Sequence, residues 1–560
     1  MPDTPSPVAH WPLAKDARDA VGDRHGHAEA LTFTAGPDGS AAGAAEFDGS
    51  RSAVRIDHHP SLRLGTGDFT FTAWIRCEKA MTHVFGDVLS KFDPVGRTGV
   101  NLHVSGSSPA YSSMSDQRHV HFGIDDGYIG AWEDLGKPEA TNSNVTSLIT
   151  LQGELYAGIA DAIDPRRACR VLRYAGGQTW EDCGRLCDDL GVLSVMSMHV
   201  HEGKMYAGSG NWDWARAEGA MPGFTPTHVH VYEYQGNAEW RDLGQVGEGY
   251  RLMSMCSFEG ELYAGLDKRG GGGVYRYTGD GWADCGAPDG RNIEGFLPSG
   301  GRLYAATHGR VYRYEGGTSW TCICKDPFGI NQIHCIAEVE GRLWIGTWPQ
   351  GCVLRQGGDG EWINTGRLGI PEGLHECNEV MDLRVHNGKL YAALIPKSQL
   401  WRYEADGQWT LMGSLASRPD WHDDDCDSWC RITSLGSHRG RLIAATGSCY
   451  SRAAHQDAED TLGRVHAMNV GQVASHEHDI GGDWTHLAAV RAGKQTRLYV
   501  NGKLAASADA PPRTTLDLTN VSPLRIGAGP STYFKGAIAD VRLYSAAIDE
   551  KTIHNLPRHG

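Results

Sequence analysis

One short segment recurs seven times in this chain of 560 residues. Each copy has an apolar stretch, then a turn of the form Gly-[Lys/Glu/Arg]-[Leu/Met], then a residue that begins a second apolar stretch. These residues are Tyr156, Tyr206, Tyr263, Tyr304, Trp344, Tyr391 and Ile443. A small or short polar residue stands nine positions before each: Ser147, Ser197, Ser254, Gly295, Cys335, Asp382 and Ser434. Constant spacing inside the unit and variable spacing between units predict a repeated pair of strands.

In each repeat unit, the residues that follow the segment described above end in a tryptophan. An alternating strand, such as 274–277 or 311–314, leads through a turn to a Trp. The series is Trp180, Trp240, Trp282, Trp320, Trp362 and Trp409. A seventh Trp, Trp132, precedes the first unit in a run that matches residues 180–184. The pattern predicts a seven-bladed β-propeller whose last blade takes its outer strand from the N-terminal side, so that no sheet edge stays open.

The sequence outside the repeats predicts a second domain, split between the two ends of the chain. It contains Phe69-Thr-Phe-Thr-Ala-Trp-Ile75, Asp483-Trp-Thr-His-Leu-Ala-Ala489, Leu498-Tyr-Val-Asn-Gly-Lys503 and the strand 534–544. Together and in this order, these segments resemble the strands of a laminin-G-like (concanavalin A-like) jelly roll. The resemblance implies an all-β chain: jelly roll at 1–126, inserted propeller at 127–471, and the rest of the jelly roll at 472–560.

Composition and charge narrow the classes of partner. The formal charge is 52 − 68 = −16, which argues against non-specific binding to nucleic acid or to an anionic membrane. No run of 18 apolar residues is present to cross a membrane. The first residues lack a basic and then apolar signal segment. We therefore expect either an intracellular protein or a secreted one whose signal is missing from this sequence; the oligomeric state is left open.

The residues that enter the first strand of each unit point to one face of the propeller. Eleven positions before each repeat aromatic, the residue is always aliphatic, which predicts packing between blades. Twelve positions before, it is always polar, which predicts a ring around the mouth of the central channel. This ring comprises Asn144, Ser194, Arg251, Asn292, Gln332, Glu379 and Arg431.

The loops that leave the second strands are expected at the same face. They supply Asp161, Asn211, Trp212, Trp214, Asp267, Lys268, Arg269, His308, Trp348, Lys397 and Tyr450. Tryptophan beside amides is suited to stacking on sugar rings. The rim cations favour an anionic ligand, such as a uronate, held by guanidinium contacts. The predicted partner is therefore a polysaccharide or oligosaccharide, with Asn144, Trp212, Trp214, Lys268, Arg269, Asn292, Trp348 and Arg431 as its binding residues.

Three chemistries stay open at this face. In β-elimination at a uronate, a cation neutralises the carboxylate while an acid and a base move protons; Tyr250, Arg251, His334 and His308 are the predicted catalytic set. The propeller is similar, in architecture only, to those of polysaccharide lyases and glycosidases. Hydrolysis would use paired carboxylates among Glu294, Glu379 and Asp382. The third alternative is a platform that binds a glycan or a protein without catalysis, as laminin-G-like domains often do.

Metal ions are not expected to be required for the function of this protein. No thiolate cluster with zinc spacing is present, and no cofactor is required by the three chemistries. The acidic loop at 423–427 makes calcium possible. His119 and His121 alternate along one strand, for which a surface strand is the preferred interpretation over a zinc site.

Overall fold

The structure is a computed structural model that describes residues 5–106, 114–140, 144–161, 164–211, 227–267, 272–325, 327–371, 378–416, 430–447, 462–512 and 515–556. In these ranges the chain is almost entirely β, apart from the 3₁₀ turns η1 (Pro60–Leu62) and η3 (Pro327–Gly329) and the helix α1 (Glu550–Asn555). The all-β prediction is confirmed. No helix within these ranges has the length and apolar character needed to cross a membrane.

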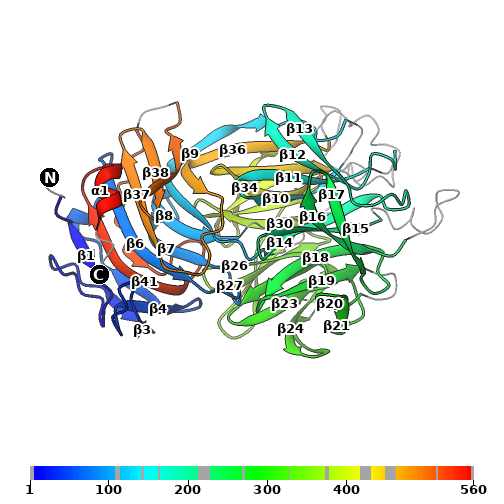
Figure 1. Ribbon diagram of the computed structural model, residues 1–560, viewed down its shortest axis with the longest axis horizontal. Helices are drawn as coiled ribbons and strands as arrows, with labels where there is room; N and C mark the ends of the chain where they lie inside the picture. Colours follow the sequence, from blue (N-terminus) through cyan, green and yellow to red (C-terminus); the bar gives the residue numbers. More distant parts are fainter. Residues whose placement is uncertain are drawn as a thin grey trace.

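One end of the molecule is a two-sheet sandwich built from both ends of the chain (Figure 1). In the first sheet the strand order is β3-β4-β41-β6-β37-β38-β39, with β1 also paired to β41. The bounds are β1 (Ala9–Trp11), β3 (Thr32–Thr34), β4 (Ala44–Asp48), β6 (Phe69–Cys77), β37 (Thr485–Ala492), β38 (Gln495–Val500), β39 (Lys503–Asp509) and β41 (Lys535–Tyr544).

The second sheet of the sandwich continues into the propeller. Its strand order is β2-β5-β40-β7-β8-β9-β36-β35-β34. The sandwich part consists of β2 (His27–Glu29), β5 (Ala53–Ile56), β40 (Leu524–Ile526), β7 (Gly86–Asp93), β8 (Thr98–Ser105) and parts of β9 (His119–Asp134) and β36 (Val465–His476).

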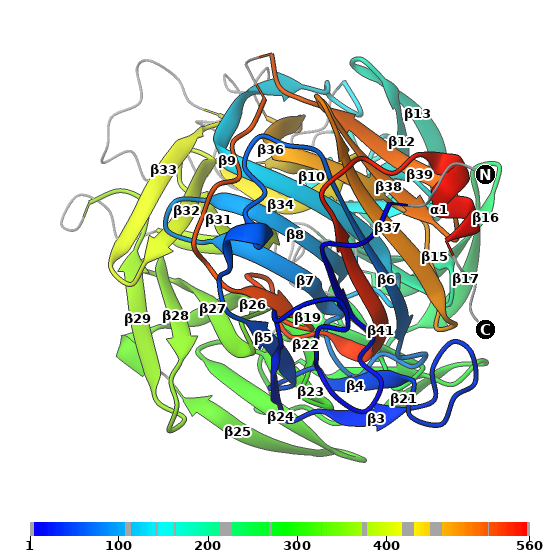
Figure 2. The same cartoon turned by 90° about the vertical axis from the view of Figure 1, so that its left-hand side faces the viewer.

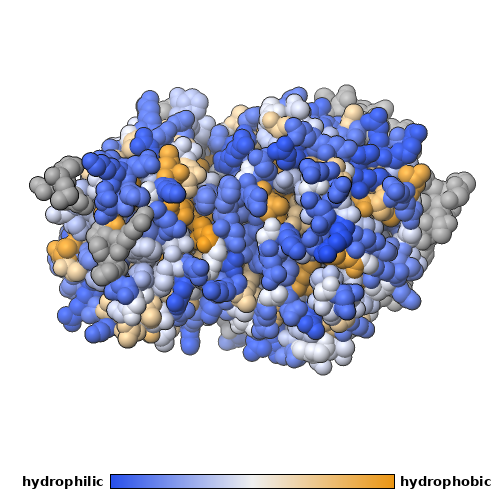
Figure 3. Space-filling model, in the orientation of Figure 1, coloured by the Kyte–Doolittle hydropathy of each residue, from blue (hydrophilic) through white to orange (hydrophobic). Residues whose placement is uncertain are grey.

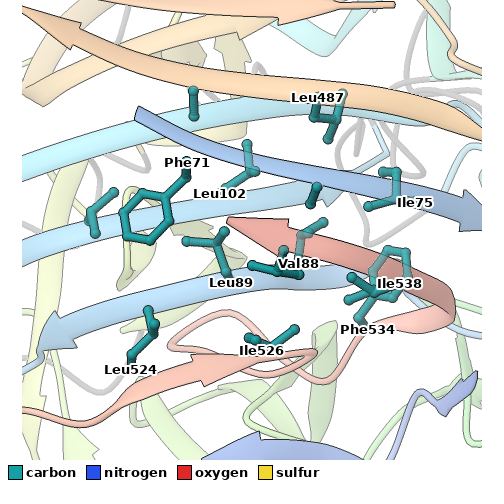
Figure 4. Close-up of a cluster of buried hydrophobic side chains, with 14 of the residues drawn as sticks. Phe71, Ile75, Val88, Leu89, Leu102, Leu487, Leu524, Ile526, Phe534 and Ile538 are labelled. Carbon is teal, nitrogen blue, oxygen red and sulfur yellow. The ribbon is translucent and has the colours of Figure 1, made fainter. Parts of the chain in front are cut away.

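The core of the sandwich lies between its two sheets (Figure 4). Side chains alternate across a strand, so Phe71 and Ile75 of β6 point inward, away from solvent. They meet Leu89 from the facing sheet together with Leu487 and Ile538 from the C-terminal segment. The two ends of the chain therefore share one hydrophobic core.

Six blades of the propeller are formed by consecutive strands. The first blade consists of β10 (Asn144–Leu151), β11 (Glu154–Ala160), β12 (Arg170–Gly176) and β13 (Thr179–Arg185), and the second of β14 (Ser194–His201), β15 (Lys204–Gly210), β16 (His230–Gly236) and β17 (Glu239–Gln245). The third consists of β18 (Arg251–Phe258), β19 (Glu261–Asp267), β20 (Val274–Tyr277) and β21 (Trp282–Asp284), and the fourth of β22 (Gly295–Ser299), β23 (Arg302–Ala306), β24 (Arg310–Gly316) and β25 (Ser319–Lys325). The fifth consists of β26 (Gln332–Val339), β27 (Arg342–Trp348), β28 (Cys352–Gln356) and β29 (Trp362–Arg367), and the sixth of β30 (Glu379–His386), β31 (Lys389–Ile395), β32 (Gln399–Ala405) and β33 (Gln408–Ser414).

The seventh blade is completed by two strands that belong to both domains. β34 (Arg431–His438) and β35 (Arg441–Gly447) are followed by β36, and β9 pairs along the whole of β36. Met468 pairs with Trp132 in the blade, and Ser475 pairs with His121 in the sandwich. This confirms that the outer strand of the last blade precedes the repeats. The limits 126/127 and 471/472 fall inside these two strands, so the division of the chain there stays a proposal.

The outer tryptophans hold neighbouring blades together. The indole N–H of Trp180 donates to the Leu135 carbonyl at 2.9 Å, and that of Trp240 donates to the Cys183 carbonyl at 2.8 Å. Trp320 makes the same bond to Cys285 at 2.9 Å. Each of these bonds runs from one blade to the outer strand of the blade before it, so the tryptophans have a structural role.

The sandwich covers one face of the propeller, which we call the closed face. It is formed by the hairpin turns between the first two strands of the blades. The amide of Gly153 donates to the Glu477 carbonyl at 2.9 Å, and that of Glu340 donates to the Ser531 carbonyl at 2.8 Å. Seen from the sandwich side, the blades surround this contact (Figure 2). Hydrophilic residues cover most of one side of the molecule, with apolar residues in small separate groups (Figure 3).

Candidate functional site

The opposite face of the propeller, the open face, is where the first strand of each blade begins. In six blades the pairing with the second strand shifts by one residue there, for example between Val145 and Ser147 and between Ile333 and Cys335. Such a β-bulge redirects a side chain. The bulged residues are Thr146, Met196, Met253, His334, Met381 and Thr433. In the fourth blade Glu294, just before β22, holds the equivalent position.

Three of the bulged residues are methionines, and they form an apolar floor. Met196, Met253 and Met381 come from three different blades and make one buried cluster with Ala160 and Ile395. Side chains from separate blades can meet in this way only near the propeller axis. The sequence analysis assigned these methionines no role, although their repeated appearance ten positions before the aromatic was visible.

Next to this floor, charged side chains from adjacent blades form a connected arc. His308 Nε2 lies 3.0 Å from Glu294 Oε1. His334 Nε2 lies 2.7 Å from Glu379 Oε1, and its Nδ1 lies 3.6 Å from Glu294 Oε2. Gln332 Oε1 also accepts from His334 Nε2 at 2.6 Å. One imidazole therefore stands between two carboxylates.

Two arginines extend the arc on either side. Arg251 is ion-paired with Asp267, whose side chain is fully buried. The charge of Arg251 also acts on Glu294, and that of Arg431 acts on both Glu379 and His334. From the third blade to the seventh, negative and positive groups thus alternate.

The ionisation of these groups follows from their neighbours. Burial opposes the charged form of His334, but the carboxylates of Glu379 and Glu294 outweigh it and raise the pKa of His334. Burial also opposes ionisation of Glu294, yet His308, His334 and Arg251 lower the pKa of Glu294 to about 2. In Glu379, burial is outweighed by His334 and Arg431, which lower its pKa. The two flanking carboxylates therefore favour the protonated form of His334.

This arrangement bears on each predicted chemistry. The raised pKa of His334 favours its protonated form, so it is better suited to act as an acid than as a base. Glu294 and Glu379 are both ionised and have an imidazole between them, where a glycosidase would place the sugar. Asp382 accepts backbone N–H groups of Leu383 and Leu435, both at 2.8 Å, and burial raises the pKa of Asp382 to about 7.

The other predicted residues are distributed over the same face. Asn292 Nδ2 lies 3.2 Å from His308 Nε2, and the Tyr250 ring stacks on His228 at a centroid distance of 5.6 Å. Asn144 is completely buried at the start of β10, against the seventh blade. Trp212, Trp214, Lys268, Arg269 and the acidic loop 423–427 lie outside the described residues. Calcium therefore stays a prediction.

Several buried polar atoms at this face have no hydrogen-bond partner within the described part of the chain. Both polar ends of the Asn211 amide are in this state, although the side chain is 2% exposed. The indole N–H of Trp348 is in the same state. Trp348 is the last residue of β27, and in the strand register it lies opposite Gln332 of β26. Glu294 Oε2 and His334 Nδ1 face each other at 3.6 Å, beyond hydrogen-bond distance. The sequence placed Asn211 in a loop at this face but did not single it out as a binding residue, since one amide within a longer loop has no distinguishing spacing.

Comparison with known families identifies one part of the chain. The model of the concanavalin A-like lectin/glucanases superfamily matches residues 426–554. This segment contains the C-terminal strands of the sandwich and the first strands of the seventh blade. It bears out the resemblance to a laminin-G-like jelly roll. The chain matches no curated protein.

Solved structures similar to this chain are β-propellers. One is YCF48 bound to D1 peptide (13% identity, TM-score 0.40, covering 61% of this chain and 98% of that one). A second is virginiamycin B lyase from Staphylococcus aureus (10%, 0.42, 60% and 99%). A third is the WD40 propeller domain of Doa1 (10%, 0.40, 61% and 97%). At these identities and scores, no ligand or activity of theirs carries over to this chain, whose fold is a seven-bladed propeller inserted in a laminin-G-like jelly roll.

Proposed function

We propose that the open face of the propeller binds a glycan without cleaving it. The observation that carries this proposal is the mutual neutralisation of the charges in the arc: Arg251 is paired with Asp267, and His334 is paired with Glu379. A uronate lyase needs a cation available to the substrate carboxylate and a base that can accept a proton. A hydrolase needs one protonated carboxyl group. In the resting arc both of these cations are paired with carboxylates, and neither Glu294 nor Glu379 is protonated.

The ligand that suits this face is rich in hydroxyl groups and uncharged. The buried amide of Asn211 and the indole N–H of Trp348 each have hydrogen-bonding capacity that no described residue uses. Leaving such groups unpaired is unfavourable, so a ligand that pairs with them gains affinity. A half-buried indole beside amides is also suited to stacking on a sugar ring. Because positive and negative groups are balanced in the arc, a neutral glycan is favoured over the uronate expected from the sequence.

A second candidate is β-elimination at a uronate-containing polysaccharide. The raised pKa of His334, with Arg431 nearby, favours it, because a protonated imidazole can donate to the leaving oxygen. Tyr250 or His308 would then act as the base. In this alternative the substrate carboxylate displaces Glu379 or Glu294 from the imidazole.

One experiment separates these alternatives. The whole chain is mixed with matched neutral and uronate-containing oligosaccharides, and binding is followed by calorimetry while ultraviolet absorbance reports unsaturated uronate. We expect saturable binding of a neutral glycan, constant absorbance and no new reducing ends. Growth of the absorbance would establish elimination instead, and new reducing ends would establish hydrolysis. Absence of binding to every glycan would refute the proposal.

Variants assign the binding to the open face. Trp348→Phe and Asn211→Ala should each weaken glycan binding about tenfold, the loss of one good hydrogen bond in a buried site. The matched control is Trp282→Phe in the outer strand β21, where the indole N–H also lacks a partner among the described residues. Equal weakening in Trp282→Phe would show that the effect is indirect.

A further inference from the structure

A cavity of about 100 Å³ lies between the two domains, at the closed face of the propeller. Its propeller wall is formed by the first strands of the fourth, fifth and sixth blades, through Leu297, Ile336 and Leu383. Its sandwich wall includes Phe85 and His103. The lining is mainly apolar, and neither domain encloses the space alone.

One side chain of this lining is charged and has no partner. Arg384 of β30 is 9% exposed, and it makes no hydrogen bond or ion pair with any described residue. An arginine stays protonated in proteins. A buried charge without a partner strongly destabilises a folded protein, because the attraction that would offset its desolvation is missing. The closed face therefore has a cation without an ion-paired anion among the described residues.

The groups around Arg384 do not supply that anion. Four buried imidazoles lie near Arg384, those of His103, His119, His121 and His386. Burial is the largest cause that lowers the pKa of each, and the positive charge of Arg384 lowers it further. Asp382 and Glu477 are the acids whose charges act on Arg384. Both are already engaged: Asp382 accepts two backbone N–H groups, and Glu477 accepts from His438 at 3.0 Å.

The carboxyl group in the cavity lining is also occupied. Glu338 accepts from the hydroxyls of Ser299 and Thr532, and burial raises the pKa of Glu338 to about 7. Its interactions therefore join the two domains at one side of the cavity. They leave the guanidinium of Arg384 without an acceptor.

We propose that this cavity binds a small monocarboxylate with an apolar body. The carboxylate would pair with Arg384, since a guanidinium matches carboxylate geometry with two parallel hydrogen bonds. The body would pack against Ile336, Leu383 and Phe85. The volume corresponds to roughly three water molecules, which suits an acid of about four carbons. This site is separate from the open face and is independent of the glycan proposal.

Binding here has a predictable consequence, because both domains form the wall. A ligand that binds the native state and not the unfolded chain raises the unfolding temperature by mass action. It also supplies the missing counter-charge. The ligand is therefore expected to stabilise the docking of the sandwich on the propeller.

The test uses the whole chain with butyrate and, as its neutral isostere, butyramide, at constant ionic strength and pH 7.5. We expect a saturable rise of the unfolding temperature with butyrate and saturation-transfer NMR signals from bound butyrate. Butyramide should produce neither. Equal effects of the two compounds, an equal effect of chloride or phosphate, or no butyrate binding would each overturn the proposal.

Two arginine variants complete the design. Arg384→Met removes the charge at nearly constant volume, so it should abolish butyrate binding while the ligand-free protein unfolds at the wild-type temperature or above it. Arg402→Met is the matched control: Arg402 is also 9% exposed, but it is paired with Glu404 at 2.6 Å. It should lower the unfolding temperature and retain butyrate binding. If Arg384→Met does not fold, Arg384→Lys should fold and bind butyrate at least tenfold more weakly; unchanged affinity in either Arg384 variant would overturn the proposal.

Discussion

The two faces of the propeller both bury histidines, and they shift the pKa values of these histidines in opposite directions. On the closed face, burial and the nearby Arg384 lower the pKa of His103 to about 4, and burial with the same arginine lowers the pKa of His386 to about 3. On the open face His334 is buried as well, but two carboxylates raise its pKa. Burial is common to both faces, so the neighbouring charges decide the state of each imidazole.

This difference separates a structural face from a ligand-facing one. On the closed face the lowered pKa values favour the neutral form of His103 and His386, which bind uncharged polar groups, as His386 does with the Ser437 hydroxyl at 3.1 Å. The open-face arc consists of ions that compensate one another beside unpaired polar atoms. Arg384, which has no ion pair with any described residue, is part of the lining of the cavity for which we propose a ligand. Five substitutions test this comparison.

The largest effect is expected for Arg251→Ala on the open face. It removes the guanidinium that is ion-paired with the fully buried Asp267 and that also stabilises ionised Glu294, so the free energy of unfolding should fall by about 3–5 kcal/mol. Urea denaturation measures this loss. The control, Arg313→Ala, breaks a half-exposed pair with Glu315 and should cost less than about 1 kcal/mol. Similar losses in both variants would mean that the arc is not a buried ion network.

Asn387→Ala should have the next largest effect, on the closed face. Asn387 Oδ1 accepts from Asn101 at 3.0 Å, and its Nδ2 donates to the Val470 carbonyl at 2.8 Å. Removing the amide leaves a buried polar group unpaired in each of the two partners, so the free energy of unfolding should fall by about 2–3 kcal/mol. Glu259→Ala is the control for placing alanine at a positive φ angle. Glu259 has the same hairpin position, with φ 53°, but its side chain is exposed. Differential scanning calorimetry should show no such loss in the control.

The pH dependence of two histidine variants should have opposite signs. The pKa of His386 in the folded state, about 3, is below the unfolded value near 6.5. The contribution of His386 to the free energy of unfolding is therefore present above pH 6.5 and is lost as the pH falls toward 3. The stability difference between wild type and His386→Asn should shrink by about 1.4 kcal/mol per pH unit, or about 2 kcal/mol between pH 6.5 and 5.

For His334 the folded pKa is raised, so its contribution is present below pH 6.5 and is lost as the pH rises through the folded value. His334→Gln should therefore be most destabilising in acid and least in alkali. Urea unfolding of both variants at pH 5, 6.5 and 8 measures this contrast. Parallel trends would show that the two histidines do not differ in charge.

The smallest effect on stability is expected for Trp348→Phe. The ring is half-buried and its N–H makes no hydrogen bond to the described residues, so the change should stay within about 0.5 kcal/mol. Thermal unfolding checks this value, and glycan binding should fall in the same variant. A large loss of stability would assign the indole to the fold instead of the site.

Much of the architecture could be predicted because repeats carry it. The aliphatic residue eleven positions before each aromatic and the Trp of each outer strand indicate the same packing in every blade. The sequence also placed Arg251, His308, His334 and Arg431 at one face, since equivalent repeat positions share one end of the ring. Their pairing could not be predicted, because distances between blades depend on the closure of the ring.

Other features followed from contacts that no local pattern records. His119 and His121 were expected on a surface strand, yet they are 3% and 4% exposed beneath the docked domain. The methionine floor depends on bulges in separate blades, and β9 and β36 run through both domains, so that the predicted limits fall inside strands.

The sequence by itself determined the all-β fold, the number of blades, the exchange of the last outer strand and the split sandwich, because periodicity and strand alternation are local properties of the chain. Only the tertiary structure decided which histidines are charged, which carboxylates are neutralised and where Arg384 lies without a partner. Ionisation depends on the distances between groups brought together from distant parts of the chain, and those distances exist only once the ring has closed and the sandwich has docked on it.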